Sequence, residues 1–288
     1  MRIKSLHGKK CFITGAASGI GKATAIAAAQ DGAELFLTDI NAPALADVTA
    51  AIRSEGGSVR FSAAIDIADF EAVKSMAKEI QDAHGSMDVL MNIAGISIWG
   101  AVENLKHDQW RRAIEINLMG PIHVLECFVP EMIRAGRGGH IVNVSSAAGL
   151  FGLPWHAAYS ASKFGLRGVS EVLRFDLKRH HIGVSLVCPG GVDTGLVNTL
   201  EIEGIDTSSP VIASFKKHFR KMAISPERAA SSILKGIKAN RYMVFTSFDI
   251  HLLHWVQGKF SLPYELIMRF LNNRMQSVYE QTSIGSSK

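Results

Sequence analysis

The chain has 288 residues, of which 47% are hydrophobic and 20% charged, and its formal net charge is +5. This length suits one large α/β domain with a substantial core, and no polar block divides it in two. The charge excess is mild, and we expect no nucleic-acid partner. The sequence shows neither a signal peptide nor an apolar run long enough to span a membrane, and its three cysteines lie far apart, so we expect a cytoplasmic protein.

Short apolar runs alternate with longer amphipathic patterns along the chain, which predicts βαβ units and a parallel sheet. We expect strands over residues 10–14, 34–39, 59–65, 89–93, 140–145, 183–188 and 242–246. We expect helices over residues 20–30, 43–55, 70–83, 108–135, 155–180 and 226–238. The last of these helices has a clear start, with Ser225 as its cap and Pro226 at its first position.

The turn after the first expected strand reads Thr14-Gly15-Ala16-Ala17-Ser18-Gly19-Ile20-Gly21. Glycines here let the backbone approach a pyrophosphate, whose negative charge the free amides of the following helix attract. Asp39 ends the second expected strand. A carboxylate at that place accepts hydrogen bonds from ribose hydroxyls and repels a 2′-phosphate, which favours NAD over NADP as the cofactor.

Tyr159 and Lys163 are four residues apart in an expected helix, so their side chains share one face. A lysine cation beside a phenol favours the phenolate, lowers its pKa from about 10 and makes the tyrosine a usable general acid and base. The pair is common by chance when it stands alone. Its value depends on the motifs that precede it.

The glycine turn, the acidic strand end and the Tyr159/Lys163 pair, in this order, resemble the short-chain dehydrogenase/reductase family over residues 8–247. The resemblance implies a Rossmann-type, doubly wound, parallel seven-stranded sheet, with residues 1–247 as one catalytic domain and 248–288 as a helical extension. It implies that the cofactor is held by Gly15, Ser18, Gly19, Ile20, Gly21, Asp39, Asp66, Ile67, Asn92, Ala94, Gly95, Tyr159, Lys163, Pro189, Gly190, Val192 and Thr194. Ile93 departs from the family pattern, because it replaces a second Asn and removes one contact that would stabilise the sheet.

The same resemblance implies a catalytic set of Asn117, Ser146, Tyr159 and Lys163. Tyr159 would move the substrate proton, Ser146 would orient the substrate oxygen, and Asn117 would hold a water near Lys163. Ser145 is the alternative to Ser146. We expect no metal, since no cluster of His, Cys and carboxylate residues has ligand spacing.

The segments expected to border the substrate are residues 96–99, 147–156 and those after Thr194, including Leu196, Val197 and Leu200. They are mostly apolar, which favours a lipophilic secondary alcohol or ketone of the steroid, retinoid, fatty or aromatic type over a sugar. We expect residues 194–223 to form a lid. Two alternatives stay open. One is a 3-oxoacyl-thioester reductase, whose anionic carrier would meet basic residues 216–221; the other is a dinucleotide-binding sensor without activity.

Two further regions have several interpretations. Between residues 214 and 241 the basic residues far outnumber the one acid, Glu227; a solvated surface is favoured over an anion-binding one. Apolar residues at helical spacing around Leu253 and Phe270 predict two amphipathic helices in the tail. These helices would pack on the protein, form a dimer contact, border the substrate site or, less favoured, lie on a membrane surface. We expect a homodimer or homotetramer through the long helices within 108–135 and 155–180.

Overall fold

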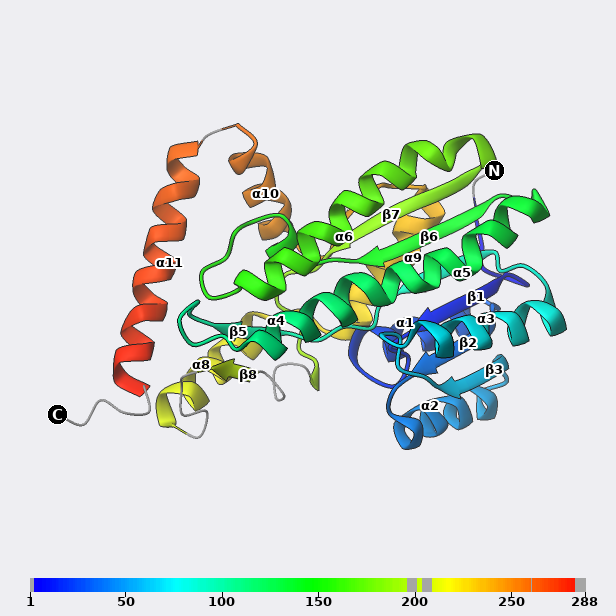
Figure 1. Cartoon of the computed structure of the whole chain (residues 1–288), viewed down its shortest axis with the longest axis horizontal. Coiled ribbons are helices and arrows are strands. Elements are labelled where there is room, and N and C mark those ends of the chain that lie inside the picture. Colours follow the sequence, from blue (N-terminus) through cyan, green and yellow to red (C-terminus); the bar gives the residue numbers. More distant parts are fainter. Residues whose placement is uncertain (1–2, 196–200, 204–208, 260, 283–288) are drawn as a thin grey trace.

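A computed structural model describes residues 3–195, 201–203, 209–259 and 261–282, and in it helices cover both faces of a parallel sheet (Figure 1). The sheet has seven strands in the order β3-β2-β1-β4-β6-β7-β9. Their bounds are β1 Lys10–Thr14, β2 Glu34–Asp39, β3 Ser58–Ala64, β4 Val89–Asn92, β6 Gly139–Val144, β7 Ile182–Cys188 and β9 Met243–Phe245. The predicted fold class is confirmed. The strand order reverses between β1 and β4, and such a reversal opens a crevice at the carboxyl ends of the strands.

Alternating side chains of each strand build two cores, one on each face of the sheet. Cys11 and Ile13 of β1 pack toward α1 Gly19–Gln30, α2 Ala42–Ser54 and α9 Pro226–Ala239. Phe12, between them, packs toward α3 Phe70–His84, α5 Gly120–Ala135 and α6 Ala157–Asp176. The alternation follows from the two-residue period of a strand, and burial on both faces explains why the strands read as continuous apolar runs.

The prediction of one continuous helix over residues 108–135 is wrong. This segment consists of α4 His107–Ile114, a π-helical turn Glu115–Met119 and α5, which begins at Gly120 with Pro121 in its first turn. A proline there needs no backbone donor, and a π-helical turn widens the helix by one residue. The turn carries Asn117, whose side chain is fully buried. The sequence shows the periodicity of the two helices but not the extra residue between them.

The structure adds three elements that the sequence analysis does not predict. β5 Ile98–Gly100 and β8 Glu201–Glu203 pair in parallel as a separate small sheet. α8 Pro210–Met222 follows, capped by the hydroxyl of Ser209, which accepts a hydrogen bond from the Ile212 amide. Of these three, β8 and α8 lie in the stretch expected to be a lid. The two strands have three residues each, too few to show a periodicity.

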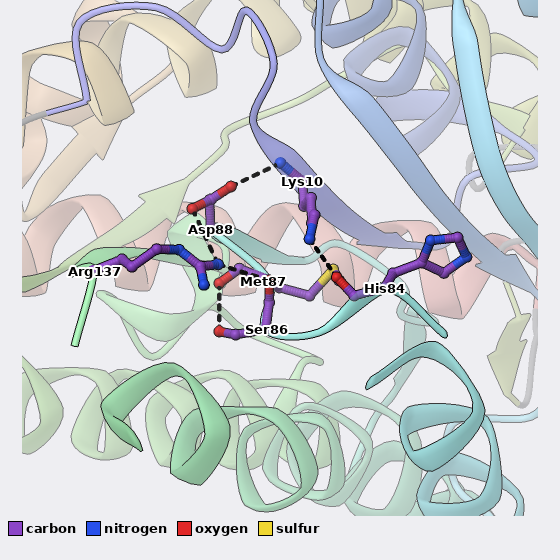
Figure 2. A network of polar contacts seen from close by, with 6 residues as sticks. All are labelled: Lys10, His84, Ser86, Met87, Asp88 and Arg137. Atoms are coloured by element: carbon purple, nitrogen blue, oxygen red, sulfur yellow. Dashed lines mark hydrogen bonds and ion pairs between the residues drawn. The ribbon is translucent and has the colours of Figure 1, made fainter. Parts of the chain in front are cut away.

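A polar network fixes the amino ends of the central strands (Figure 2). The Asp88 carboxylate accepts a hydrogen bond from the Lys10 amide at 3.0 Å and lies 3.7 Å from the Arg137 guanidinium. Arg137 also donates to the Ser86 carbonyl, and the Lys10 ammonium donates to the His84 carbonyl. The network therefore ties the start of β1 to the loop before β4 and to the turn after α5. It lies at the opposite end of the strands from the crevice and supports the scaffold.

Buried His140 of β6 makes stability depend on pH. The His140 ring and the Ser185 hydroxyl share a hydrogen bond of 2.8 Å, and burial lowers the pKa of His140 to about 4. Because the folded-state pKa lies below the unfolded value of about 6.5, the neutral ring stabilises the fold above pH 6.5, and this contribution is lost as the pH falls toward 4. We expect the free energy of unfolding to drop by about 2 kcal/mol for this histidine between pH 7 and pH 5.

Urea unfolding at pH 7 and pH 5 measures this drop, and the same comparison in His140→Asn isolates the contribution of His140. The variant is less stable at both pH values but should lose less stability on acidification than the wild type. An equal loss in the two proteins would contradict this account.

Two helices follow the sheet, as predicted for the tail. α10 Phe248–Gln257 packs under α11 Ser261–Thr282, which runs past the outer end of the molecule from α10 toward α8 (Figure 1). Pro263 lies in the first turn of α11. Within the described ranges no helix is long and apolar enough to cross a membrane.

Among the basic residues of 214–241, Lys238 pairs with Asp31 at 2.9 Å and Arg220 lies 3.7 Å from Asp193.

Candidate active site

The glycine turn between β1 and α1 lies tightly against its neighbours. Gly15 has φ +70°, and a Cβ there would stand 2.8 Å from the Cα of Ala94. A Cβ on Gly21 would stand 1.9 Å from the Gly15 carbonyl oxygen. Exposed Ser18 is the N-cap of α1, but its side chain makes no capping hydrogen bond. The hydroxyl therefore leaves the first backbone amides of the helix available. Such a turn is the cradle that a pyrophosphate needs.

The Asp39 carboxylate is held at the end of β2, next to this turn. It accepts hydrogen bonds from the Ala17 amide at 3.0 Å and from the Asn41 amide at 2.9 Å. These two amides fix the orientation of the carboxylate. At the neighbouring strand end, exposed Asp66 accepts from the Ala68 amide, while Ile67 is buried against Gly120.

The end of β4 connects the cofactor turn to the expected catalytic residues. The Thr14 hydroxyl accepts hydrogen bonds from the amides of Ile93 and Ala94, at 3.0 and 3.1 Å. Asn92 donates to the Asn143 side chain at 2.9 Å, and within the described part of the chain its own oxygen has no partner. Ile93 cannot make the contact of the Asn that it replaces. The side-chain oxygen of neighbouring Asn92 is buried and unsatisfied among the described residues.

Asn117 holds the loop after β4 in place. Its side-chain oxygen accepts from the Ile96 amide at 2.9 Å, and its nitrogen donates to the Ile96 carbonyl at 3.0 Å and to the Ser162 hydroxyl at 3.2 Å. A Cβ on Gly95 would stand 2.8 Å from that oxygen and 3.3 Å from the Lys163 ammonium. The backbone at Gly95 therefore lies between Asn117 and Lys163, with no room for a side chain.

Ser146 and Tyr159 meet at the carboxyl end of β6. Their side chains are hydrogen-bonded, and Ser146 also accepts from the Ala148 amide at 3.1 Å. Ser145 instead donates to the backbone carbonyl of Lys163 at 3.0 Å. Of the two serines, Ser146 is thus the one beside the phenol, and Ser145 fixes helix α6 to the strand.

Lys163 is buried one helical turn beyond Tyr159. Its ammonium donates to the Val144 carbonyl at 3.0 Å and lies 5.8 Å from the centroid of the Tyr159 ring. Burial lowers the pKa of Lys163 to about 8. Burial likewise raises the pKa of Tyr159 above its usual value, against a smaller lowering by the Ser146 hydrogen bond. The predicted lowering of the Tyr159 pKa is therefore wrong for the protein chain alone, because the loss of hydration outweighs the hydrogen bond with Ser146.

The segment after β7 completes the crevice. A Cβ on Gly19 would stand 3.1 Å from the methyl carbon of Thr194, so Thr194 lies beside the start of α1. The Pro189 carbonyl accepts from the Ala147 amide at 2.7 Å, and Gly190 lies against Ile250 of α10. Val192 forms a parallel bridge with Ile224. These contacts bring the residues predicted for the nicotinamide end close to those predicted for the pyrophosphate.

A cavity of about 420 Å³ opens onto Ser146, Tyr159 and Lys163. Most of its lining is apolar, and the lining includes Ile93, Ile96, Trp99, Val144, Phe151, Leu153, Val192, Phe219, Ile250, Leu253 and Leu271. The last three belong to the tail helices, so the tail borders the site, one of the alternatives that the sequence left open. The predicted rim residues Leu196, Val197 and Leu200 lie outside the described residues.

One polar residue of the cavity, His156, is the last residue of the predicted border segment 147–156 but is absent from the predicted catalytic and cofactor-binding residues. Its Nδ1 lies 2.6 Å from the Pro154 carbonyl oxygen, and its ring stands beside that of Trp99, with centroids 4.3 Å apart. Burial lowers its pKa to about 4. The sequence marks it only as the end of that border segment, three residues before Tyr159.

A doubly wound parallel sheet with a tight glycine turn at the reversal of strand order is typical of dinucleotide-binding oxidoreductases. A family model, short chain dehydrogenase, matches residues 9–203. The probable oxidoreductase EphD of Mycobacterium bovis is 33% identical over 233 residues, covering 80% of this chain but only 39% of that longer protein. The chain belongs to the short-chain dehydrogenase family.

Two solved structures resemble most of the chain. A short chain dehydrogenase/reductase from Burkholderia phymatum, in complex with NAD, superposes with a TM-score of 0.81 at 28% identity, covering 89% of this chain and 95% of that one. A metagenomic short-chain oxidoreductase in complex with NADP superposes with a TM-score of 0.67 at 32% identity, covering 83% and 96%. These two neighbours thus bind nicotinamide dinucleotides of different phosphorylation state.

Proposed function

We propose that the protein transfers a hydride between NAD and a lipophilic secondary alcohol or ketone, of the steroid, retinoid, fatty or aromatic type. The observation that carries this proposal is the mostly apolar cavity of about 420 Å³ that ends at Ser146 and Tyr159. A cavity of this size and lining suits one lipophilic ligand with a single reacting oxygen. The alternative is a 3-oxoacyl-thioester reductase, which would typically use NADPH and would need a site for its carrier. Comparing the turnover of different substrates distinguishes the two.

The residues at the closed end have distinct roles. A bound nicotinamide dinucleotide supplies or accepts the hydride. In oxidation, the Tyr159 phenolate takes the proton of the substrate hydroxyl, while Ser146 donates a hydrogen bond to the oxygen that becomes the carbonyl. Lys163 gives the site a positive charge that favours the phenolate, and Asn117 keeps the loop at Ile96 in place beside it. In reduction, Tyr159 returns the proton.

The cofactor fits the crevice between the glycine turn and the end of β7. The turn at Gly15 and Gly21 leaves no room for side chains, as expected where a pyrophosphate approaches the backbone. Asp39, oriented by two amides, would accept hydrogen bonds from the adenosine ribose and repel a 2′-phosphate. This supports NAD as the preferred dinucleotide.

Replacing Asp39 by Asn tests that preference. The amide keeps the shape of the carboxylate but removes the charge that would face a 2′-phosphate, so we expect NADPH to bind about tenfold more tightly and NADH more weakly. Fluorescence titration of both dinucleotides measures the change. Asp66→Asn, at an exposed carboxylate on the next strand end, is the matched control and should leave the ratio of the two affinities unchanged. A wild type that prefers NADPH would overturn the role given to Asp39.

Leu271 of α11 provides a test of the apolar cavity. Leu271→Trp places a large ring at the outer wall, so kcat/KM for bulky ketones should fall by about tenfold or more while small ketones are little affected. Leu266→Trp is the control, because Leu266 lies on the same helix but is 57% exposed. Turnover of a panel of cyclic, aromatic and aliphatic ketones, with sugar ketones included, measures both. Equal effects of the two variants, or a wild type that prefers sugars, would refute the proposed substrate class.

The proposal also includes a domain division, an oligomeric state and a cellular location. Residues 1–247 form the catalytic domain and 248–288 an extension that borders the substrate. α6 carries exposed Val172 and Phe175, 58% and 63% accessible, which supports a homodimer or homotetramer through this helix and α5. Measurement of the molecular mass in solution for wild type and Val172→Arg tests the interface. We place the protein in the cytoplasm.

A further inference from the structure

We propose that His156 is a specificity-determining residue that accepts a hydrogen bond from a second hydroxyl group of the substrate, a few bonds from the reacting carbon. The proposal rests on the proposed function, because it concerns the same cavity. It narrows the substrate class from a lipophilic ketone or alcohol to one that carries an additional hydrogen-bond donor.

His156 lies in the cavity wall between two aromatic residues. Its ring centroid is 4.3 Å from that of Trp99 and 6.2 Å from that of Tyr159. The side chain is 9% exposed, and it shares the cavity with Ser146 and the tail helices. A substrate whose oxygen reaches Tyr159 and Ser146 therefore passes the imidazole.

The loop holds this ring in a fixed orientation. The His156 amide donates to the Leu153 carbonyl, and the Trp155 carbonyl accepts from the Gly100 amide at 2.9 Å. The 2.6 Å contact of Nδ1 with the Pro154 carbonyl adds a side-chain restraint. Groups fixed in this way are suited to select a substrate, because little freedom is lost when it binds.

The contact with Pro154 also determines which ring nitrogen carries the proton. A carbonyl oxygen only accepts, so Nδ1 is the donor, and in the neutral ring Nε2 is then an acceptor. Burial keeps the ring neutral by lowering its pKa to about 4. Nδ1 faces the chain's own turn, and among the described residues no group donates a hydrogen bond to Nε2. The cavity therefore contains a lone-pair acceptor that the protein itself does not satisfy.

The other polar side chains at the closed end take part in the reaction. Tyr159 and Ser146 both act at the reacting oxygen, so they leave no partner for Nε2. An apolar group bound against Nε2 would leave a buried acceptor unsatisfied, whereas a hydroxyl would pair with it. The cavity should therefore prefer a hydroxy ketone over the ketone that lacks only that hydroxyl.

Benzoin and deoxybenzoin form a suitable probe pair, since the two aromatic ketones differ by one hydroxyl. Their dissociation constants are measured by calorimetry with wild type, His156→Phe and His156→Gln in the absence of dinucleotide, so that the ketones are not reduced and the hydroxyl of benzoin is not oxidised. We expect wild type to bind benzoin about tenfold or more tightly than deoxybenzoin, His156→Phe to abolish that ratio, and His156→Gln, which retains an acceptor, to restore most of it. A purely structural role would change both affinities alike and leave the ratio intact.

Reduction of both ketones with NADH separates this proposal from the proposed function. If the affinity ratio follows His156 but neither ketone is reduced, the proposed function fails and the role of His156 stands. Equal affinities in wild type, an unchanged ratio in His156→Phe, or no binding of either ketone would overturn the role of His156.

Discussion

Replacing Tyr159 by Phe is expected to lower kcat by about 10² to 10⁴, the range contributed by general acid–base catalysis, and to leave the affinity for NADH unchanged. The substitution removes only the phenol oxygen, which is hydrogen-bonded to Ser146 at the closed end of the cavity. The ring stays in place, so the cavity keeps its shape. Initial rates of NADH formation and a parallel fluorescence titration of NADH measure the two quantities.

Tyr242→Phe is the matched control for this variant. The Tyr242 hydroxyl is buried outside the cavity and lacks a hydrogen-bond partner among the described residues, so its removal should leave turnover near the wild-type value. The pH profile adds a second readout. Since burial raises the pKa of Tyr159, oxidation, which uses the phenolate, should accelerate as the pH rises above neutrality, whereas reduction, which uses the protonated phenol, should stay nearly constant until the pH approaches that raised pKa. Undiminished turnover in Tyr159→Phe would remove Tyr159 from the chemistry.

Gly15→Ala is expected to weaken NADH binding by about tenfold or more and to destabilise the fold by about 1 to 3 kcal/mol. Two effects combine at this position. The backbone has φ +70°, which costs an alanine about 1 to 2 kcal/mol, and the new Cβ would stand 2.8 Å from the Cα of Ala94. Backbone atoms on both sides of the contact cannot rotate away, so the turn itself must shift.

Gly8→Ala separates the two effects. Gly8 has φ +66°, nearly the value at Gly15, but a Cβ there would meet no atom within 4 Å. Both variants therefore have the conformational cost, and only Gly15→Ala adds the collision at the cofactor turn. Thermal unfolding and NADH titration of the pair measure stability and affinity. Equal NADH affinities in the two variants would show that the turn does not contact the dinucleotide.

The sequence predicts well those features that a few adjacent residues determine. The glycine turn, the cap at Ser225 and the alternation of strands and helices all depend on local chemistry, and the Ser225 hydroxyl does accept from the Arg228 amide. Asp39 at a strand end is likewise local. The register of the strands then brings these positions to one edge of the sheet without further information.

The features that the sequence misses depend on packing between distant segments. The π-helical turn at Asn117 adds one residue to a helix whose periodicity otherwise looks continuous. The direction of the Tyr159 pKa shift depends on how much water the fold removes, and the choice between Ser145 and Ser146 depends on which hydroxyl reaches the Tyr159 phenol rather than the backbone of α6. The tail borders the cavity because the Gly152 amide donates to Tyr264 and Ile250 reaches Gly190, contacts that no local pattern encodes.

Direct transfer of hydrogen from substrate to cofactor is the central claim. It is measured with a lipophilic secondary alcohol that carries deuterium on its hydroxyl-bearing carbon, incubated with NAD⁺ and wild-type protein, with mass spectrometry of the NADH formed. We predict one deuterium in each NADH, a slower rate than with unlabelled alcohol, and no product with Tyr159→Phe. NADH formed without deuterium, or no NADH from any lipophilic alcohol despite tight NAD⁺ binding, would contradict the account.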